Sequence, residues 1–402
     1  MSKQNGQAAS VPHGYKMTEV GVVPEEWGVA NLGDLASVRS GGTPSTAQGE
    51  FWNGPLPWCT PTDITRLQGK RHIRRTERTI SESGLAASSA ELIPTGSVVM
   101  TTRATIGACA INVVPMTTNQ GFKNLIPGPD IDGEFLFYQM SAQEKGLVAL
   151  CGGSTFLEIS KAQVSRYRIP YPVSLPEQNA IATALSDTDD LITSLERLIT
   201  KKRRIKQGTM QELLSGERRL EGFEGEWERR RLGEVAHVKT GSKNTEDRVH
   251  DGHYPFFGRS EVVERINSYS HDCEAILVPG EGRIGEIFHY ICGKFDVHQR
   301  VYAITEFDES VDGRFVHYFM KSNFGHHAME LTVKATVDSL RLPTFLDFEM
   351  TLPNSRAEQK AIAHILTTLD TELTTLETKL MKLRRLKEGM MGELLGGRVR
   401  LV

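Results

Sequence analysis

PEQNAIATALSDTDDLITSLERLITKKRRIKQGTMQELLSGERRL, residues 176–220, recurs later in the chain as AEQKAIAHILTTLDTELTTLETKLMKLRRLKEGMMGELLGGRVRL, residues 357–401. The two stretches align without a gap at an offset of 181, and 22 of the 45 positions are identical. Similarity at one fixed offset indicates an internal duplication. The chain of 402 residues therefore divides into two related halves, each a globular region followed by a helical region.

The duplicated segments are predicted to be long helices, each with one apolar face. In the second copy Leu and Ile recur in alternating steps of four and three, the heptad pattern of coiled coils. The first copy keeps this pattern with interruptions at Thr188, Lys202 and Lys206. An apolar stripe is by itself only a packing face, but two in one chain can pair with each other. We expect an antiparallel coiled coil formed by Ile181, Leu185, Ile192, Leu195, Ile199, Ile362, Leu366, Leu369, Leu373, Leu376, Leu380 and Leu383.

The regions before the helices share a sparser skeleton. The motif D-G-x-F-x-x-Y-x-M occurs at 132–140 and again at 312–320, and Gln120 corresponds to Gln299. Runs such as GSVVMTT, ACAINVV, EAILVPG and EIFHYICG alternate with Gly, Pro and Asn and predict strands, whereas FLFYQMSAQ and RFVHYFMKSN predict short helices. Five positions also recur at an offset of 200, namely Trp27, Leu32, Gly33, Val38 and Gly41, matched by Trp227, Leu232, Gly233, Val238 and Gly241.

These patterns predict an α+β fold with a pseudo-twofold internal repeat, in which two mixed, strand-rich domains are separated by two long paired helices. We expect a flexible N-terminal segment over 1–19, a first domain over 20–173, a helical spacer over 174–220, a second domain over 221–352 and a second spacer over 353–402. Because the chain ends at GGRVRL, where the first copy continues into EGFEGEW, we expect its end to lie near Trp27.

Composition narrows the class of protein without identifying it. The formal net charge of -3 gives no whole-chain signal for nucleic-acid binding, so any such signal must be local. The five cysteines contain no CxxC pair, and no apolar run reaches the roughly 18 residues of a membrane span, so we expect a cytoplasmic protein. His271-x-Cys273 and His289-x-x-Cys292 match no common zinc module, and we expect no metal site.

Taken together, the layout resembles that of specificity subunits of type I restriction–modification enzymes. The resemblance covers essentially the whole chain, as two target-recognition domains that are each followed by a similar helical region. Its stretches are VPEEWGVANLGDLASVRSGGTP, LPWCTPTDIT, TTRATIGACAI and TTNQGF in the first half, and GEWERRRLGEVAHVKTG, YPFFG and LPNSRAEQKAIAHIL in the second. The second half departs at His298-Gln299-Arg300, where the first half has Asn119-Gln120-Gly121.

The resemblance implies a subunit that binds double-stranded DNA and docks two methyltransferase subunits and motor–nuclease subunits. S-adenosylmethionine, ATP and Mg²⁺ would then belong to the partner subunits, and this chain would have no catalytic residue and no cofactor. The sequence agrees, because it contains no G-x-x-x-x-G-K-[ST] phosphate loop and no [ND]-P-P-[YF] adenine-methylation motif. A nuclease-like string, Asp370 with Glu377-Thr378-Lys379, lies on the heptad helix and is interpreted as a coiled-coil flank.

DNA contacts are expected in polar loops and in the basic run RLQGKRHIRRTER, residues 66–78, although such a run can also be a solvated face. Arg and Lys suit guanine edges and phosphates, Asn and Gln suit adenine, and Thr can contact the thymine methyl group. The candidates in the first domain are Ser40, Thr43, Thr60, Asp63, Lys70, Arg71, Arg74, Arg103, Thr105, Gln120, Lys123 and Thr155. The candidates in the second domain are Lys239, Ser242, Lys243, Asn244, Arg259, Arg283, Gln299, Arg300, Lys334 and Thr336.

Two readers joined by a stiff spacer should recognise two unlike half-sites separated by unread base pairs. The spacer would set that gap, so four residues inserted after Gln211 should lengthen it. A basic cluster, Lys201-Lys202-Arg203-Arg204-Lys206, recurs as Lys382, Arg384, Arg385 and Lys387 and could serve either a partner subunit or DNA. Two alternatives stay open, a self-contained DNA-modifying enzyme and a coiled-coil interaction protein without a DNA role.

Overall fold

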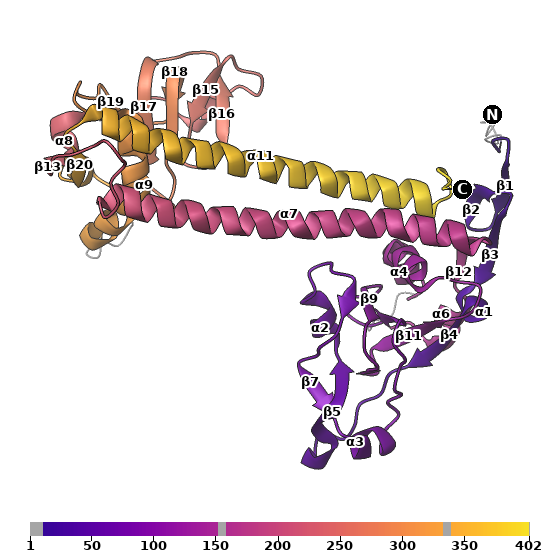
Figure 1. The fold of residues 1–402 in the computed structure, drawn as a ribbon. Coiled ribbons are helices and arrows are strands. Elements are labelled where there is room, and N and C mark those ends of the chain that lie inside the picture. The colour runs from indigo at the N-terminus through magenta and orange to yellow at the C-terminus, as the bar shows by residue number, and fades with distance from the viewer. Residues whose placement is uncertain (1–10, 152–157, 333–338, 402) are drawn as a thin grey trace. The chain divides into compact units, whose positions relative to one another are not determined.

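The computed structural model describes residues 11–151, 158–332 and 339–401, which belong to two compact units. Unit 1 comprises residues 1–195 and 379–402, and unit 2 comprises residues 196–378. Each unit contains one globule and the adjoining parts of both long helices (Figure 1). The predicted fold class is confirmed, with two mixed α+β globules and two long helices that lie side by side.

The first globule is built around a five-stranded sheet and a smaller three-stranded sheet. The larger sheet has the order β4-β11-β8-β9-β6, the smaller has β10-β5-β7, and β3 pairs separately with β12. Helix α4 packs against β8, β9 and β11 through Phe135, Leu136 and Met140, all of which are fully buried. The elements are β1 (Tyr15–Thr18), β2 (Gly21–Pro24), β3 (Trp27–Asn31), α1 (Leu32–Leu35), β4 (Ala36–Ser40), η1 (Gly49–Phe51), β5 (Trp52–Cys59), α2 (Pro61–Thr65), β6 (His72–Ile73), β7 (Arg78–Ile80), α3 (Glu82–Ala86), β8 (Val98–Thr101), β9 (Cys109–Asn112), β10 (Thr117–Thr118), β11 (Phe122–Pro127), α4 (Gly133–Ser141), α5 (Glu144–Ala149), α6 (Lys161–Arg166) and β12 (Arg168–Pro172).

The second globule has one six-stranded sheet with the order β14-β19-β17-β18-β15-β16. Strand β13 pairs separately with β20, as β3 does with β12. The runs that predicted strands form strands, and FLFYQMSAQ lies mostly in the short helix α4, which confirms these predictions. RFVHYFMKSN is helical as predicted, but it belongs to α9, which is 20 residues long and not short. The elements are β13 (Trp227–Arg231), α8 (Leu232–Val235), β14 (His237–Thr240), η2 (Thr245–Asp247), β15 (Tyr254–Phe257), β16 (Val263–Ile266), β17 (His271–Pro279), β18 (His289–Val297), β19 (Val301–Thr305), α9 (Gly313–Thr332), α10 (Leu342–Leu346) and β20 (Glu349–Pro353).

The two globules repeat one strand arrangement despite their different sequences. The order β4-β11-β8-β9 corresponds to β14-β19-β17-β18, and long strand β18 occupies the places of both β9 and β10. Strand β10 pairs in parallel with β5, and β18 pairs in parallel with β15. Each globule is closed by the same backbone hydrogen bond, from Leu32 N to Tyr167 O and from Leu232 N to Phe348 O, both 2.9 Å.

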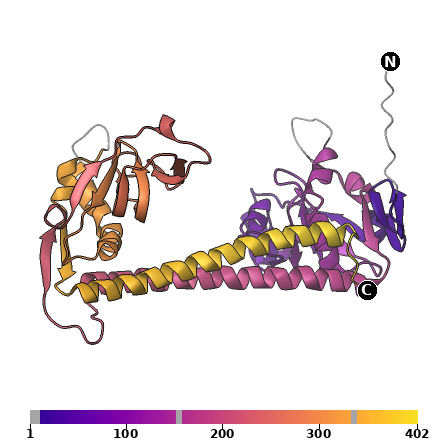
Figure 2. The same cartoon turned by 90° about the horizontal axis from the view of Figure 1, so that it is seen from above.

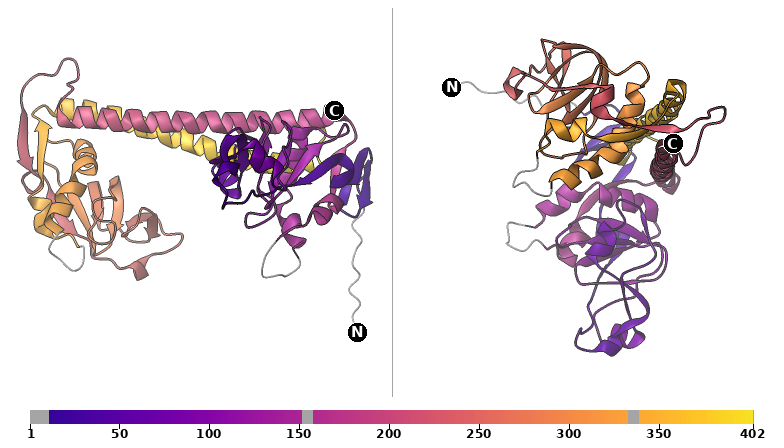
Figure 3. Two further views of the ribbon diagram at one scale, coloured as in Figure 1. Left: turned by 90° about the horizontal axis from the view of Figure 1, so that it is seen from below. Right: turned by 90° about the vertical axis from the view of Figure 1, so that its left-hand side faces the viewer.

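Helices α7 (Leu175–Ser215) and α11 (Arg356–Leu395) run antiparallel in both units. In unit 1, Asp189 forms an ion pair with Lys387 and Glu177 forms one with Arg400. In unit 2, Lys202 forms an ion pair with Glu372. Figures 2 and 3 show the two helices side by side from further directions.

The apolar residues expected to pair the two helices, here called the seam, pack both against the globules and against the opposite helix. Ile181 and Leu185 are fully buried in the core of the first globule together with Leu394 and Leu395 of α11, and Ile362 and Leu366 lie likewise in the core of the second. Leu195, Ile199 and Leu373 are also buried. The remaining expected pairing residues are partly buried, namely Ile192, Leu369, Leu376, Leu380 and Leu383. The seam therefore anchors each helix to its own globule as well as to the other helix.

A partly buried contact of three residues occurs in each unit, with the roles of the two helices exchanged. In unit 1 Lys387 Nζ lies 2.6 Å from Asp189 Oδ1, and the Tyr138 hydroxyl donates to Asp189 Oδ2 at 2.7 Å. In unit 2 Lys206 pairs with Asp370, which also accepts from the Tyr318 hydroxyl at 2.9 Å. Lys206 therefore interrupts the heptad pattern because it forms an ion pair.

A second exchanged contact joins the helix starts to the segments that follow the opposite helices. Arg219 binds both carboxylate oxygens of Glu358, and Arg400 binds both of Glu177. Both carboxylates are almost fully buried, so their charges require these partners. In the duplicated alignment Arg219 corresponds to Arg400, and Glu177 to Glu358.

The C-terminal segment returns to the start of the first globule (Figure 1). The Tyr15 hydroxyl donates to Gly397 O at 3.2 Å, and Arg400 Nη2 lies 2.9 Å from Glu26 Oε2. The expected proximity to Trp27 is confirmed for the described part of this segment, because Gly397 packs against the Trp27 ring. Residues 15–18, expected to be flexible, instead form β1, which pairs with β2, whereas residues 1–10 lie outside the described residues.

No helix in the described ranges is both long enough and apolar enough to cross a membrane.

Candidate nucleic-acid interface

In the first globule, several strands end at one place, and the loops that follow them lie together. Gly42 N donates to Thr118 O at 2.9 Å, Asn119 N to Cys59 O at 2.9 Å and Thr102 N to Gly121 O at 2.7 Å. These bonds bring together the ends of β4, β5, β8 and β10 with the start of β11. We call the predicted residues at this place the first loop cluster, which consists of Ser40, Thr43, Thr60, Arg103, Gln120 and Lys123.

Side chains of the first loop cluster form hydrogen bonds and ion pairs within the globule. Thr43 Oγ1 is hydrogen-bonded to Gln120 Oε1, and Arg103 Nη2 lies 2.7 Å from both oxygens of Glu158. Lys123 is opposite Ser40 across the β4–β11 ladder. Burial lowers the pKa of Lys123; nearby Arg103 lowers it further, and Glu158 opposes the shift. Gln120 is exposed and Thr43 is partly exposed, whereas Lys123, three residues after Gln120, is buried.

Two residues that were predicted to contact DNA, Asp63 and Arg71, are instead largely shielded from solvent and bind other groups of unit 1. The Asp63 carboxylate, 6% exposed, accepts from Thr60 N at 2.8 Å and from Glu77 N at 2.9 Å, so it shapes the loop. Arg71 donates to Ser186 O at 3.1 Å and lies 3.3 Å from Asp190 Oδ1. These groups are occupied by intramolecular partners because the fold brings distant acids and amides to them.

The other predicted residues of the first globule are more dispersed. Lys70 and Thr105 line a cavity beside α4, and Arg74 is exposed on the loop between β6 and β7. Thr155 lies outside the described residues, as do Lys334 and Thr336 of the second globule.

The second globule has a loop cluster at the corresponding place. His298 N donates to Phe257 O at 3.1 Å, Lys243 N to Val297 O at 3.2 Å and Gly280 N to Arg300 O at 2.8 Å. These bonds join the ends of β14, β15, β17 and β18 to the start of β19. The predicted residues here, the second loop cluster, are Ser242, Lys243, Asn244, Arg259, Gln299 and Arg300.

The second loop cluster is more strongly charged than the first. Gln299 Nε2 donates to Asn244 Oδ1, and Arg259 and Arg300 lie 3.5 and 3.3 Å from the carboxylate oxygens of Glu281. Burial lowers the pKa of His298, and the two arginines lower it further. Two predicted residues lie at its margin: Lys239, exposed on β14, and Arg283, paired with Glu261 and Glu286.

Two glycines show that the clusters are built alike. A Cβ atom on Gly41 would lie 1.9 Å from Asn119 O, and one on Gly241 would lie 2.0 Å from Val297 O. Both distances are far below any real contact, so only glycine lets these loops approach the opposite strand. Gln120 and Gln299 then follow at matching turns and each bonds a polar side chain of the loop beyond the glycine.

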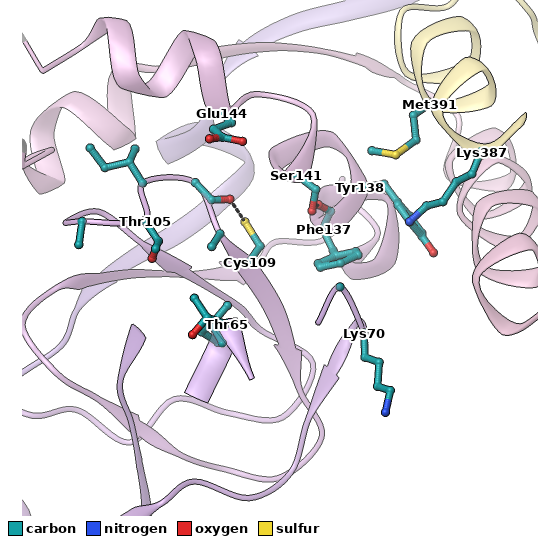
Figure 4. Close-up of a pocket in the computed structure, with 16 residues that line it drawn as sticks. Thr65, Lys70, Thr105, Cys109, Phe137, Tyr138, Ser141, Glu144, Lys387 and Met391 are labelled. Atoms are coloured by element: carbon teal, nitrogen blue, oxygen red, sulfur yellow. Dashed lines mark hydrogen bonds between the residues drawn. The ribbon is translucent and has the colours of Figure 1, made fainter. Parts of the chain in front are cut away.

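A cavity of about 580 Å³ in unit 1 lies between α4, the β8–β9 turn and α11 (Figure 4). Tyr138, Cys109, Lys387 and Met391 line it. Burial raises the pKa of the Cys109 thiol to about 12, so the thiol stays protonated and is a poor nucleophile. Among the described residues no group of three or more His, Cys, Asp or Glu is placed to hold a metal ion.

A cavity of about 720 Å³ in unit 2 is lined by the duplicated counterparts Lys206 and Met210, together with Asp370. The two cavities therefore lie at corresponding places in the duplicated halves, as the two ion pairs do.

Sequence reasoning missed the acids Glu158 and Glu281, which pair with arginines of the two clusters. It included Arg78 in the basic run 66–78 but did not single it out or predict its stacking. The acids lie far from their partners along the chain, so no local pattern pointed to them. The signal for Arg78 was the pair Trp52 and Trp58, two aromatic residues on one strand.

The chain is similar in sequence to known DNA specificity subunits. A family model described as Type I restriction modification DNA specificity domain matches residues 24–207 and 224–384. The MjaIX specificity subunit of a type I restriction enzyme from Methanocaldococcus jannaschii is 34% identical over 278 residues, which are 64% of this chain and 63% of that protein. The alignment therefore spans less than two thirds of that relative's own length. The MjaVIII specificity subunit from the same organism is 24% identical over 94% of both chains.

A solved structure shows a similar fold over most of the chain. The crystal structure of a type I restriction–modification system S subunit from M. genitalium matches with a TM-score of 0.66 and 17% sequence identity. The match covers 92% of this chain and 96% of that one.

Proposed function

The chain belongs to the type I restriction–modification DNA specificity family, and from this premise we propose that it reads a bipartite target in double-stranded DNA, one half-site per globule. The observation that carries the proposal is the pair of loop clusters, which are built on one backbone plan but carry different side chains. The first presents Thr43 and Gln120, and the second presents Asn244, Gln299 and arginines. Different donors and acceptors select different base pairs, so the half-sites are unlike.

The proposal assigns the chemistry to other subunits. Two methyltransferase subunits dock on this chain, with motor–nuclease subunits completing the assembly. The exchanged contacts of the two units support the number two, because they give the chain two similar faces. S-adenosylmethionine, ATP and Mg²⁺ are bound by those partners in the cytoplasm, and this chain contributes recognition rather than catalysis.

Family membership favours this function over a self-contained DNA-modifying enzyme and over a coiled-coil protein without a DNA role. The structure adds an argument against the second alternative only, because two loop clusters with Gln, Asn and Arg side chains would have no purpose in a coiled-coil protein without a DNA role.

The test uses Gln120→Ala and Gln299→Ala, each in the full chain with its methyltransferase partner. Genomic adenine methylation is mapped for the unchanged chain and for both variants. Each variant should lose discrimination in one half-site only, by about 1–3 kcal/mol at the affected base pair. The two variants serve as controls for each other, since the half-site that one affects should be unchanged in the other. Loss in both half-sites from either change would contradict one reader per globule.

A further inference from the structure

Arg78 of the first globule is stacked on two tryptophans next to the first loop cluster. It begins β7 and lies directly opposite Trp58 of β5. Its guanidinium carbon is 3.7 Å from the centroid of the Trp52 ring and 5.2 Å from that of Trp58. The two indoles meet edge to face, with centroids 4.9 Å apart. A planar, delocalised cation is attracted to the face of an indole ring, so this stacking fixes the plane of the guanidinium.

The tryptophans are themselves fixed. Trp52 and Trp58 are 9% and 4% exposed and pack with Ile80 and Ala90 in a small core of their own. Their indole N–H groups hold the loop that carries Thr43, because Trp58 Nε1 donates to Gly42 O at 2.9 Å and Trp52 Nε1 to Ser45 O at 3.1 Å. The rings that orient Arg78 are therefore the rings that position part of the first loop cluster.

No carboxylate among the described residues neutralises the charge of Arg78. In the same basic run Arg66 pairs with Glu77, and Arg71 is surrounded by acids. Arg78 is exposed, and within the described residues it forms no ion pair. Stacking occupies the face of the guanidinium and leaves its edge, with five N–H donors, directed away from the rings.

We propose that Arg78 is a specificity-determining residue of the first half-site, whose guanidinium edge donates to O6 and N7 of a guanine. The inference rests on the proposed function and extends it to a residue of the basic run 66–78 that the sequence alone did not single out. A phosphate needs only a nearby positive charge, which the exposed Arg74 and Arg75 supply. Bidentate recognition of guanine needs a fixed plane, which stacking provides.

The test compares Arg78→Lys and Arg78→Ala with Arg75→Ala, in the full chain with its methyltransferase partner. Arg75 is an exposed cation three residues away that stacks on no ring within the described residues, so it is the matched control. Binding is measured by competition between the target and duplexes with one base pair changed, at several salt concentrations. Both Arg78 variants should reduce discrimination at one G·C pair of the first half-site by about 5- to 150-fold. Arg75→Ala should leave discrimination intact.

The Lys variant keeps the charge and removes the planar fork, which separates base reading from phosphate contact. If Arg78→Lys discriminates like the unchanged chain, or if the loss is equal for all sequences, the inference is overturned. Discrimination in the second half-site reports, in the same sample, that each variant is folded. If the unchanged chain shows no sequence preference in either half-site, the proposed function itself fails. If the unchanged chain discriminates between sequences and both Arg78 variants discriminate equally well, only the inference about Arg78 fails.

Discussion

Single atoms decide how closely the loops of the candidate interface approach the strands. A methyl group at Gly241 would overlap Val297 O, and neither backbone can move without breaking the hydrogen bond from Lys243 N to Val297 O. We expect Gly241→Ala to lower the free energy of unfolding by about 1–3 kcal/mol, because overpacking forces the loop away. Denaturant unfolding measures this. The control is Gly208→Ala in α7, where an added Cβ atom would meet nothing within 4 Å apart from the nearby backbone of its own helix, and it should raise stability by roughly 0.5–1 kcal/mol. Equal effects from the two changes would refute the packing argument.

His317 of α9 is a buried histidine, and we expect it to make the stability of the second unit sensitive to acid. Burial, together with the nearby charges of Lys321 and Arg314, lowers its pKa to about 4, and a hydrogen bond with the Phe288 backbone and the charge of the Asp370 carboxylate oppose this shift. Since the pKa in the folded state is below the unfolded value near 6.5, the neutral ring's contribution is complete above about pH 6.5. It is lost as the pH falls towards 4. The His317 Nε2 atom also finds no hydrogen-bond partner in the described structure.

We expect His317→Phe to remove up to roughly 3 kcal/mol of the stability loss between pH 6.5 and pH 4. Phenylalanine is the natural choice, because Phe137 occupies this position in the first globule. Thermal unfolding across this pH range gives the comparison. A variant as acid-sensitive as the unchanged chain would show that His317 is not the group responsible.

At the scale of the elements, the interruption of the α7 heptads at Lys206 follows from one of the exchanged ion pairs. We expect Lys206→Met to destabilise the protein by roughly 1–2 kcal/mol. The change removes the ion pair of the partly buried Asp370 carboxylate and leaves it the hydrogen bond from the Tyr318 hydroxyl. The double variant Lys206→Asp with Asp370→Lys should recover part of this loss. The control is Arg203→Met, whose pair with Glu377 is more exposed and worth less than about 1 kcal/mol. Chemical unfolding of the four proteins is the measurement. Similar losses for Lys206→Met and Arg203→Met would contradict a special role for the partly buried pair of Lys206 and Asp370.

Sequence predicted the elements well where a pattern is local. The heptads located both long helices, and the recurrence of Gly41 and Gln120 as Gly241 and Gln299 marked the corners of both loop clusters. It failed where partners are distant along the chain. The acids Glu134 and Asp190, which occupy Arg71, approach it only in the folded unit. A charge run therefore showed where cations are, but only the fold showed which of them are free.

At the scale of the whole molecule, the helices should measure the gap between half-sites. An insertion after Gln211 is unsuitable, because Leu213 and Leu214 beyond it are 2% and 3% exposed in the second core. The antiparallel pairing requires both helices to be lengthened, after Leu195 in α7 and after Thr378 in α11, where the two units divide.

Four helix-favouring residues in each helix add about 6 Å of rise, against about 3.4 Å per base pair. We expect methylation mapping to show the same half-sites with a gap one or two base pairs longer. Insertion in α7 alone should abolish activity, since it moves Lys206 out of register with Asp370. An active paired variant with an unchanged gap would show that the helices do not set the spacing.

The central claim is that each globule reads its own half-site, and the chain supplies the means to test it on itself. The backbone bonds from Leu32 N to Tyr167 O and from Leu232 N to Phe348 O mark equivalent boundaries, so residues 232–348 can replace residues 32–167. The chimera keeps both long helices and the two-stranded ladders β3–β12 and β13–β20. Methylation mapping of the chimera with the methyltransferase partner is the measurement. We predict a target in which the second half-site appears on both sides of the gap as an inverted repeat. An active chimera that still methylates the original, asymmetric target would contradict the claim.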